Sequence, residues 1–297
     1  MTLDLHGRVA IVTGGGAGLG RSHALLLASR GAKLVVNGPG QADSRARVDA
    51  VVAEIRGAGG EAVASYDSVE RAEGGAAIAA TAIEAFGKID ILVNNAGFVR
   101  DRSFIKAELE DIEAVIRVHL MGTIHCTKAV WPLMNEQGYG RIVVTTSMAA
   151  TSGNFGQSAY GAAKAGVLGL MNCLALEGRK RNVLVNAISP VAATAMTAGM
   201  FPEDSAAAFA PDLVSPAVAW LASERCDVSG HTITAGGSAF GRVHYFETAG
   251  VRFGADQPAS VEAFDAQFAA VDSLAGAEEC AIGSRMRAAF PQAPKAT

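Results

Sequence analysis

A glycine-rich turn near the N-terminus constrains the fold more than any other stretch of this chain. Residues 8–13 form a short apolar, β-branched run that is typical of a buried strand, and residues 21–30 have the pattern of a helix. The turn between them has the spacing Thr-Gly-x-x-x-Gly-x-Gly rather than Gly-x-Gly-x-x-Gly. A strand that enters a helix through such a turn can hold a pyrophosphate on backbone amides. We predict cofactor-binding positions at Gly14, Gly18, Leu19 and Gly20, with a plain tight turn as the alternative.

The same alternation of strand and helix continues along most of the chain. Further strand-like runs lie at residues 32–37, 61–66, 89–93, 141–147, 182–188 and 231–235, with helical segments between most of them. This order is typical of an α/β protein with a doubly wound parallel sheet, the Rossmann fold. We expect one domain over residues 1–240. The pattern weakens in residues 241–297, which we interpret as a C-terminal appendage packed on that domain.

Composition excludes several classes of function. The chain has 297 residues, half of them hydrophobic, and a net charge of −4, so it offers no basic surface for nucleic acid. The N-terminus lacks the plan of a signal peptide, and we find no apolar stretch of about 18 residues, so we expect no membrane association. Four widely separated cysteines indicate neither a metal site nor a disulfide framework. With no Ser-Lys-Leu ending at residues 294–297, we expect a cytoplasmic protein.

The ends of the predicted strands carry the next candidate residues. An acidic residue after the second strand would bind the ribose hydroxyls of NAD, but Gly38 stands there, and no basic residue in the glycine turn would receive the 2′-phosphate of NADP. NAD is therefore the expected cofactor, with NADP not excluded. Asp67 and Ser68 follow the third strand and either contact the adenine or cap the next helix. After the fourth strand, the predicted contacts are Asn95, Ala96 and Gly97.

A serine, a tyrosine and a lysine can together move a proton on or off an alcohol oxygen. Tyr160 and Lys164 are four residues apart, which puts both side chains on one face of a helix. A phenol has a pKa of about 10, and we expect the lysine ammonium to lower it. Ser147, at the end of the fifth strand, can donate a hydrogen bond to a carbonyl oxygen. Alone, the Tyr-x-x-x-Lys spacing is equally compatible with chance on a buried helix.

One further side chain is a candidate for the catalytic site. His119 lies in a mostly apolar helical region, where a lone histidine is often a buried core residue, but we favour a role at the site. The helix expected over residues 157–177 carries almost no charge apart from Lys164. An apolar helix of this kind is buried on more than one side, so we expect a homodimer or homotetramer.

Taken together, these motifs resemble the short-chain dehydrogenase/reductase superfamily over residues 7 to about 240. The resemblance implies hydride transfer between a nicotinamide cofactor and a secondary alcohol or ketone. It also implies Ser147, Tyr160 and Lys164 as catalytic residues, with Tyr160, Lys164 and Thr194 contacting the cofactor. No metal is implied.

A narrower likeness is carried by Tyr66-Asp-Ser-Val, Arg100-Asp-Arg-Ser-Phe, Arg117-Val-His-Leu and Gly153-Asn-Phe-Gly-Gln. These segments resemble the (3R)-hydroxyacyl-CoA dehydrogenase domain of the peroxisomal D-bifunctional enzyme, which is also a 17β-hydroxysteroid dehydrogenase. That domain carries a histidine at the position of His119, where most of the superfamily has a catalytic asparagine. Gly38 and Val191 depart from the family pattern, in which an aspartate and a glycine stand.

The resemblance implies a (3R)-hydroxyacyl-CoA or a steroid-derived CoA thioester as substrate. The alternatives are a 3-oxoacyl thioester reductase and a dehydrogenase of free hydroxysteroids. A cofactor-sensing or scaffold protein on the same fold is the alternative from another class, since fold alone does not decide function.

Overall fold

The computed structural model describes residues 3–199, 203–254, 258–280 and 282. The chain divides into two units, residues 1–242 and residues 243–297. The predicted division after residue 240 lies two residues earlier. Residues 294–297, which entered the expectation about location, lie outside the described part.

The first unit is built on one eight-stranded sheet with the strand order β3-β2-β1-β4-β5-β6-β7-β8. Neighbouring strands from β3 to β7 pair in parallel. Gly237 and Ser238, both with positive φ, form the two-residue turn into the last strand. The expected doubly wound α/β fold is thereby confirmed. The strands are β1 Val9–Val12, β2 Lys33–Asn37, β3 Ala62–Ser65, β4 Ile91–Asn94, β5 Gly140–Thr145, β6 Val183–Pro190, β7 Thr232–Gly236 and β8 Ala239–Val243.

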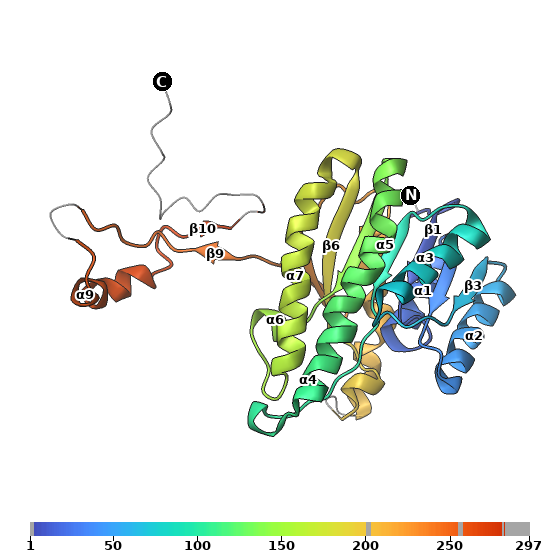
Figure 1. The fold of residues 1–297 in the computed structure, drawn as a ribbon, viewed down its shortest axis with the longest axis horizontal. Helices are drawn as coiled ribbons and strands as arrows, with labels where there is room; N and C mark the ends of the chain where they lie inside the picture. Colours follow the sequence, from blue (N-terminus) through green and yellow to red (C-terminus); the bar gives the residue numbers. More distant parts are fainter. Residues whose placement is uncertain (1–2, 200–202, 255–257, 281, 283–297) are drawn as a thin grey trace. The chain divides into compact units, whose positions relative to one another are not determined.

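Helices cover both faces of this sheet (Figure 1). The core has two parts: one brings the sheet against α1, α2 and α8, and the other brings it against α3, α5 and α7. Strands β1, β4 and β5 lie between these two parts of the core and are fully buried, which explains their nearly continuous apolar sequences. The helices are α1 Gly18–Ser29, α2 Ala42–Gly57, α3 Ala72–Phe86, α4 Leu109–Ile116, α5 Gly122–Gln137, α6 Met148–Thr151, α7 Ser158–Gly178 and α8 Ser215–Leu221.

Between α4 and α5 the chain forms a five-residue π-helical segment, Arg117–Met121. Such segments are rare and occur mostly as single turns, frequently at functional sites. This one contains the buried His119. The sequence predicted a helical region here, and the structure adds the wider turn that sets the direction of the histidine.

Helix α7 corrects one expectation. Together with the short 3-10 helix Arg179–Arg181, it is long and apolar enough to cross a membrane by length and composition, although the sequence was read as containing no such stretch. One helix of this kind is weak evidence for a membrane span. Ala163, Val167 and Met171 of α7 are buried in the core against the sheet, as in a core helix.

The described residues of the second unit contain little regular structure. Its described elements are α9 Val261–Val271 and two short strands, β9 Phe246–Glu247 and β10 Glu278–Glu279, which pair antiparallel. No residue of α9 is buried. Phe264 and Phe268 are about half exposed, and their rings are 5.8 Å apart.

Candidate active site

The glycine turn after β1 is shaped by contacts that no side chain would permit. A Cβ atom on Gly20 would lie 2.2 Å from the carbonyl oxygen of Gly14, and a Cβ atom on Gly14 would lie 2.9 Å from the Cα atom of Ala96. Gly18 adopts a left-handed conformation with φ of +51° and begins α1, which has no side-chain cap. The first amides of α1 therefore remain available to an anion. These features fit the pyrophosphate of a dinucleotide.

Hydrogen bonds between Thr13 and the residues after β4 connect this turn to the end of that strand. The Oγ1 atom of Thr13 accepts hydrogen bonds from the backbone amides of Asn95 at 3.0 Å and Ala96 at 3.1 Å. The side-chain amide of Asn95 donates in return to the carbonyl oxygen of Thr13 at 3.0 Å. Thr13 is thus a positioning residue that the sequence reading placed in the motif without giving it a role.

A first cavity of about 340 Å³ lies beside the glycine turn. Its walls include five of the predicted cofactor-binding residues: Gly14, Asp67, Ser68, Ala96 and Gly97. Ser68 accepts a hydrogen bond from the amide of Glu70, whereas α3 begins after Arg71 without a side-chain cap. The alternative that Asp67 and Ser68 cap the next helix is therefore wrong. Their position fits contacts with a nucleoside.

A second cavity of about 270 Å³ lies at the carboxyl ends of the central strands. Gly97 belongs to both cavities, so they meet at this residue. Gly18 lies beside the second one, since a Cβ there would be 3.4 Å from Thr194 Cγ2. The predicted residues in its wall are Leu19, Asn95, Gly97, His119, Ser147, Tyr160, Lys164 and Thr194.

Three elements bring the acid–base residues together in this second cavity. Ser147 follows β5 and caps the short helix α6, where its hydroxyl accepts a hydrogen bond from the amide of Ala149 at 3.2 Å. Tyr160 and Lys164 come from the first two turns of α7, with the lysine Nζ atom 5.6 Å from the tyrosine ring centroid. The chain therefore folds so that a serine hydroxyl, a phenol and an ammonium line the same space.

The ionisation of these groups differs from the sequence-based expectation. Burial raises the pKa of the Tyr160 phenol, a hydrogen bond with Ser147 lowers it, and the charge of Asp101 raises it. The Lys164 ammonium instead donates to the carbonyl oxygen of Thr145 at 2.6 Å, and burial lowers the lysine pKa to about 7. The predicted lowering of the tyrosine pKa by Lys164 is wrong for this structure, because the ammonium is directed to the strand rather than to the phenol.

His119 is held in one protonation state by the loop after β4. Its Nε2 atom lies 2.6 Å from the carbonyl oxygen and 3.2 Å from the backbone amide nitrogen of Phe98. Because the contact with the carbonyl oxygen is the shorter one and two acceptors would not adopt it, we assign the proton to Nε2. Burial and the charge of Lys164 lower the pKa of His119 to about 3, which keeps the ring neutral. Its Nδ1 atom is buried without a partner among the described residues. The imidazole packs edge-on against Tyr160 with the ring centroids 5.0 Å apart.

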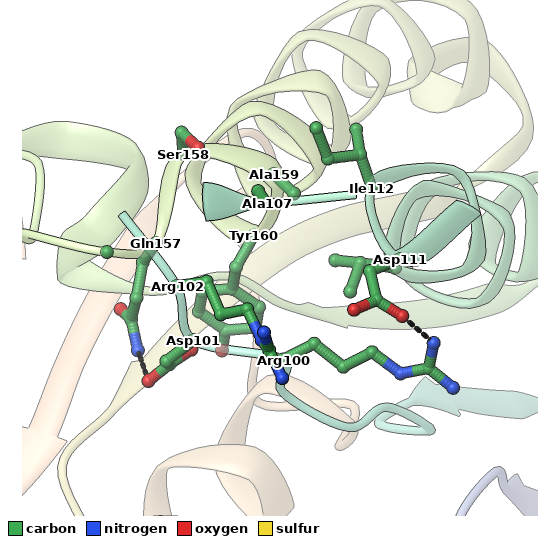
Figure 2. Close-up of a pocket in the computed structure, with 12 residues that line it drawn as sticks. Arg100, Asp101, Arg102, Ala107, Asp111, Ile112, Gln157, Ser158, Ala159 and Tyr160 are labelled. Atoms are coloured by element: carbon green, nitrogen blue, oxygen red, sulfur yellow. Dashed lines mark hydrogen bonds and ion pairs between the residues drawn. The ribbon is translucent and has the colours of Figure 1, made fainter. Parts of the chain in front are cut away.

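Sequence reasoning missed two residues close to Tyr160. Asp101 and Gln157 line a small hollow beside the phenol, and the Gln157 side chain donates to Asp101 at 2.8 Å (Figure 2). Both belong to segments of the narrower family likeness, Arg100-Asp-Arg-Ser-Phe and Gly153-Asn-Phe-Gly-Gln. That likeness was the available signal, but only the fold brings the two segments together.

Comparisons with known proteins agree with this geometry. The family profile for short chain dehydrogenases matches residues 8–205. A protein of Mycobacterium tuberculosis named as a short-chain type dehydrogenase/reductase is 46% identical over 276 residues, which cover 91% of this chain and 96% of that protein. The mouse peroxisomal multifunctional enzyme type 2 is 47% identical over 255 residues, which cover 84% of this chain and 34% of that enzyme. The chain thus spans about a third of the mouse enzyme's length.

A solved structure gives a similar result. The 7α-hydroxysteroid dehydrogenase complexed with NADH and 7-oxo glycochenodeoxycholic acid superimposes with a TM-score of 0.72 and 32% sequence identity. The match covers 79% of this chain and 94% of that chain. The fold, the paired cavities and these matches lead to one assignment. The chain belongs to the short-chain dehydrogenase/reductase family, whose members are NAD(P)-dependent oxidoreductases acting on CH–OH groups.

Proposed function

We propose that this enzyme interconverts a secondary alcohol and a ketone on a (3R)-hydroxyacyl-CoA or a steroid-derived CoA thioester, with NAD as cofactor. The observation that carries the proposal is the grouping of Ser147, Tyr160 and Lys164 in one cavity that meets a nucleotide-sized cavity at Gly97. Such a grouping fits proton transfer at an alcohol oxygen next to a hydride acceptor.

In the oxidation direction, each side chain has a distinct task. Ser147 donates a hydrogen bond to the substrate oxygen and orients it. Tyr160, as the phenolate, takes the hydroxyl proton; in reduction the phenol returns it. The chemistry that a bound nicotinamide nucleotide would supply is acceptance of the hydride from the carbon atom that carries the hydroxyl group. General acid–base assistance of this kind contributes roughly 10²–10⁴-fold to the rate.

Lys164 and His119 support this step. Lys164 lines the cavity from α7, and its ammonium would hold the nicotinamide ribose. The Nδ1 atom of His119, an acceptor in the assigned protonation state, would receive a hydrogen bond from a water molecule that passes the proton outward. In this way histidine would take the place of the asparagine that most of the family carries.

The proposed substrate class rests on the walls of the cavity. Val99, Met148, Val191 and Met196 contribute apolar surface beside the polar catalytic groups. Flexible methionines suit a bulky apolar substrate, either an acyl chain or a ring system. A free hydroxysteroid is the second candidate, favoured by the structural likeness to the 7α-hydroxysteroid dehydrogenase. A 3-oxoacyl thioester reductase and a cofactor sensor remain as weaker alternatives.

The choice of NAD is supported by charge rather than by a ribose-binding carboxylate. A Cβ atom on Gly38 would lie 2.8 Å from Val48 Cγ2 and 2.9 Å from Ser44 Oγ, so the aspartate of the family pattern would require these side chains to shift. Asp67 and Glu70 nevertheless line the first cavity, where the positive charge of Arg100 is paired with Asp111, and the two negative charges disfavour an additional phosphate. We therefore expect NAD to bind more tightly than NADP.

A spectrophotometric assay tests the proposal. Purified protein is given NAD or NADP with a (3R)-hydroxyacyl-CoA, its (3S) isomer or a free hydroxysteroid, and absorbance of the reduced nicotinamide is followed. NADH formation from the (3R) thioester alone is the expected result. Turnover of the free steroid alone would transfer the proposal to the second candidate. Cofactor binding without turnover of any alcohol or ketone would revive the sensor alternative.

Three remaining proposals concern assembly and location. The exposed stripe on α7, formed by Ala162, Ala165, Gly169, Cys173 and Leu176, fits helix packing in a homodimer or homotetramer, which light scattering would measure. We also propose, as the sequence indicates, that residues 241–297 pack on the domain of residues 1–240, which would cover the exposed apolar side chains of α9, none of which is buried in the structure. A cytoplasmic location, in contrast to the peroxisome in the mouse enzyme's name, is testable by imaging a tagged chain.

A further inference from the structure

Two loops that the proposed mechanism does not use are joined beside the catalytic tyrosine. The side chain of Gln157 donates to the carboxylate of Asp101 at 2.8 Å (Figure 2). The backbone amide of Arg102 also donates to the carbonyl oxygen of Gly156 at 2.9 Å. One loop follows β4 and the other leads into α7. Their connection closes one side of the hollow that contains Tyr160.

Gln157 is itself firmly held. Its side chain is buried, and its Oε1 atom accepts a hydrogen bond from the side-chain amide of Asn154 at 3.0 Å. Its carbonyl oxygen accepts from the amide of Gly161, at 2.7 Å, in the first turn of α7. The Asp101 carboxylate is therefore fixed relative to the same helical turn that carries Tyr160, and it is not a freely rotating surface charge.

Several other groups face the phenol. Lys164 lies on its own helix, with its ammonium directed to the Thr145 carbonyl oxygen. His119 packs against the ring from the π-helical segment and is neutral. Ser147 contributes an uncharged hydroxyl from the start of α6. None of these groups adds a negative charge.

The charges around the hollow partly cancel. Arg100 forms an ion pair with Asp111 from α4 (Figure 2). Arg102 lines the hollow with an opposing positive charge on an exposed side chain. Asp101 remains as the carboxylate that acts on the phenol, and its charge raises the pKa of Tyr160.

We propose that Asp101, held by Gln157, is a positioning residue that favours the protonated form of Tyr160 and so favours carbonyl reduction over alcohol oxidation at neutral pH. This inference rests on the proposed acid–base role of Tyr160. A negative charge near a phenol disfavours the phenolate, and only the phenolate can take a proton from an alcohol. Alcohol oxidation therefore needs a higher pH than it would without Asp101.

The substitution Asp101→Asn tests the proposal, because it removes the charge and keeps the size and an oxygen acceptor for Gln157. We expect the apparent pKa of the pH profile of kcat/KM for oxidation to fall. Each unit of fall raises the phenolate fraction about tenfold at a pH below that pKa, and the rate rises by less than this, because a phenolate of lower pKa is a weaker base. Gln157→Ala, which releases the carboxylate, should cause a smaller fall. Glu110→Gln, which removes an exposed charge from the first turn of α4, is the control and should leave the profile unchanged.

Two further measurements separate an electrostatic role from a merely structural one. Asp101 is exposed, so added salt should reduce the difference between the parent enzyme and Asp101→Asn. The ultraviolet titration of Tyr160, taken as the difference between each protein and its Tyr160→Phe form, reports the phenol without any substrate. A lowered titration midpoint in Asp101→Asn is expected, and an unchanged or raised midpoint overturns the proposal. A lowered midpoint in a protein that turns over no substrate would refute the proposed function and, with it, the effect on reduction and oxidation, and would leave only the electrostatic action of Asp101 on the Tyr160 phenol.

Discussion

The two cavities of this enzyme are built by different kinds of force. Around the glycine turn, backbone approaches backbone so closely that a single Cβ on Gly20 would lie 2.2 Å from the Gly14 carbonyl oxygen. Around Tyr160, the distances are ordinary, and burial and charge dominate: the pKa of Lys164 falls to about 7 and that of His119 to about 3. Steric contacts therefore determine which residues fit around the first cavity, whereas burial and charge determine the ionisation of the residues in the second cavity.

This difference predicts how each region responds to substitution. Adding one carbon atom to a glycine of the turn after β1 should reduce stability and cofactor binding. The same addition should have less effect at a glycine that has no close neighbour. Removing one polar atom should damage the catalytic cavity while leaving its shape intact. The following predictions test that separation.

The largest effect is expected from Tyr160→Phe, which removes only the phenolic oxygen. We expect kcat to fall about 10²–10⁴-fold, because the proton acceptor is lost, while NADH affinity stays near that of the parent. Steady-state kinetics and NADH fluorescence titration measure the two quantities. Tyr245→Phe, in the second unit, is the control and should keep full activity. Near-normal turnover by Tyr160→Phe would end the proposed mechanism.

Gly20→Ala, in contrast to Tyr160→Phe, should reduce stability and cofactor binding. The added methyl group meets the Gly14 carbonyl oxygen and the Asn95 side chain, so we expect a loss of about 1–3 kcal/mol of stability and weakened cofactor binding. Denaturant unfolding and NADH titration measure these effects. Gly57→Ala, at the end of α2 with nothing within 4 Å of its Cβ position, should be neutral or slightly stabilising. Equal effects of the two substitutions would contradict the steric account.

Acid should weaken the fold through two buried histidines, one near each region. Burial lowers the pKa of His23, in α1, and of His119 to about 3, below the ordinary value near 6.5. The unfolded chain then binds more protons between these values, so stability is complete above about pH 6.5 and is lost as the pH falls toward 3. Each histidine contributes a slope of up to about 1.4 kcal/mol per pH unit.

Unfolding free energies measured from pH 7 to pH 4 test this expectation. His23→Asn and His119→Asn should each reduce the slope, and only the second should also alter the kinetics of turnover. A slope that neither substitution changes would show that other groups control acid unfolding.

The smallest expected effect is the energetic coupling between Gly97, which lines both cavities, and His119. A Cβ atom there would lie 2.1 Å from the His119 ring, so Gly97→Ala should displace the histidine. Combined with His119→Ala, the same substitution should cost less than it does alone, with a coupling of at least about 0.5 kcal/mol. Additive effects on stability in the double-mutant cycle would mean that the two residues act independently.

Much of this protein was determined by local sequence. Short continuous apolar, β-branched runs that alternate with glycine turns and helices are typical of buried strands, so the order of elements led to the parallel sheet. The glycine spacing and the Tyr-x-x-x-Lys spacing likewise depend on neighbours a few residues apart, which is why Gly14, Gly20, Tyr160 and Lys164 were predictable.

Other features depend on segments that are distant in the chain. The lysine ammonium turns to Thr145, Asp101 meets Gln157 across 56 residues, and His119 faces Phe98 from a π-helical turn. Burial and opposing charge set the ionisation of these groups, and neither can be read from spacing along one helix. The sequence therefore indicated most of the candidate residues that line the two cavities. The tertiary structure added Asp101 and Gln157 and decided which of the residues carry a charge and toward which partner each one turns.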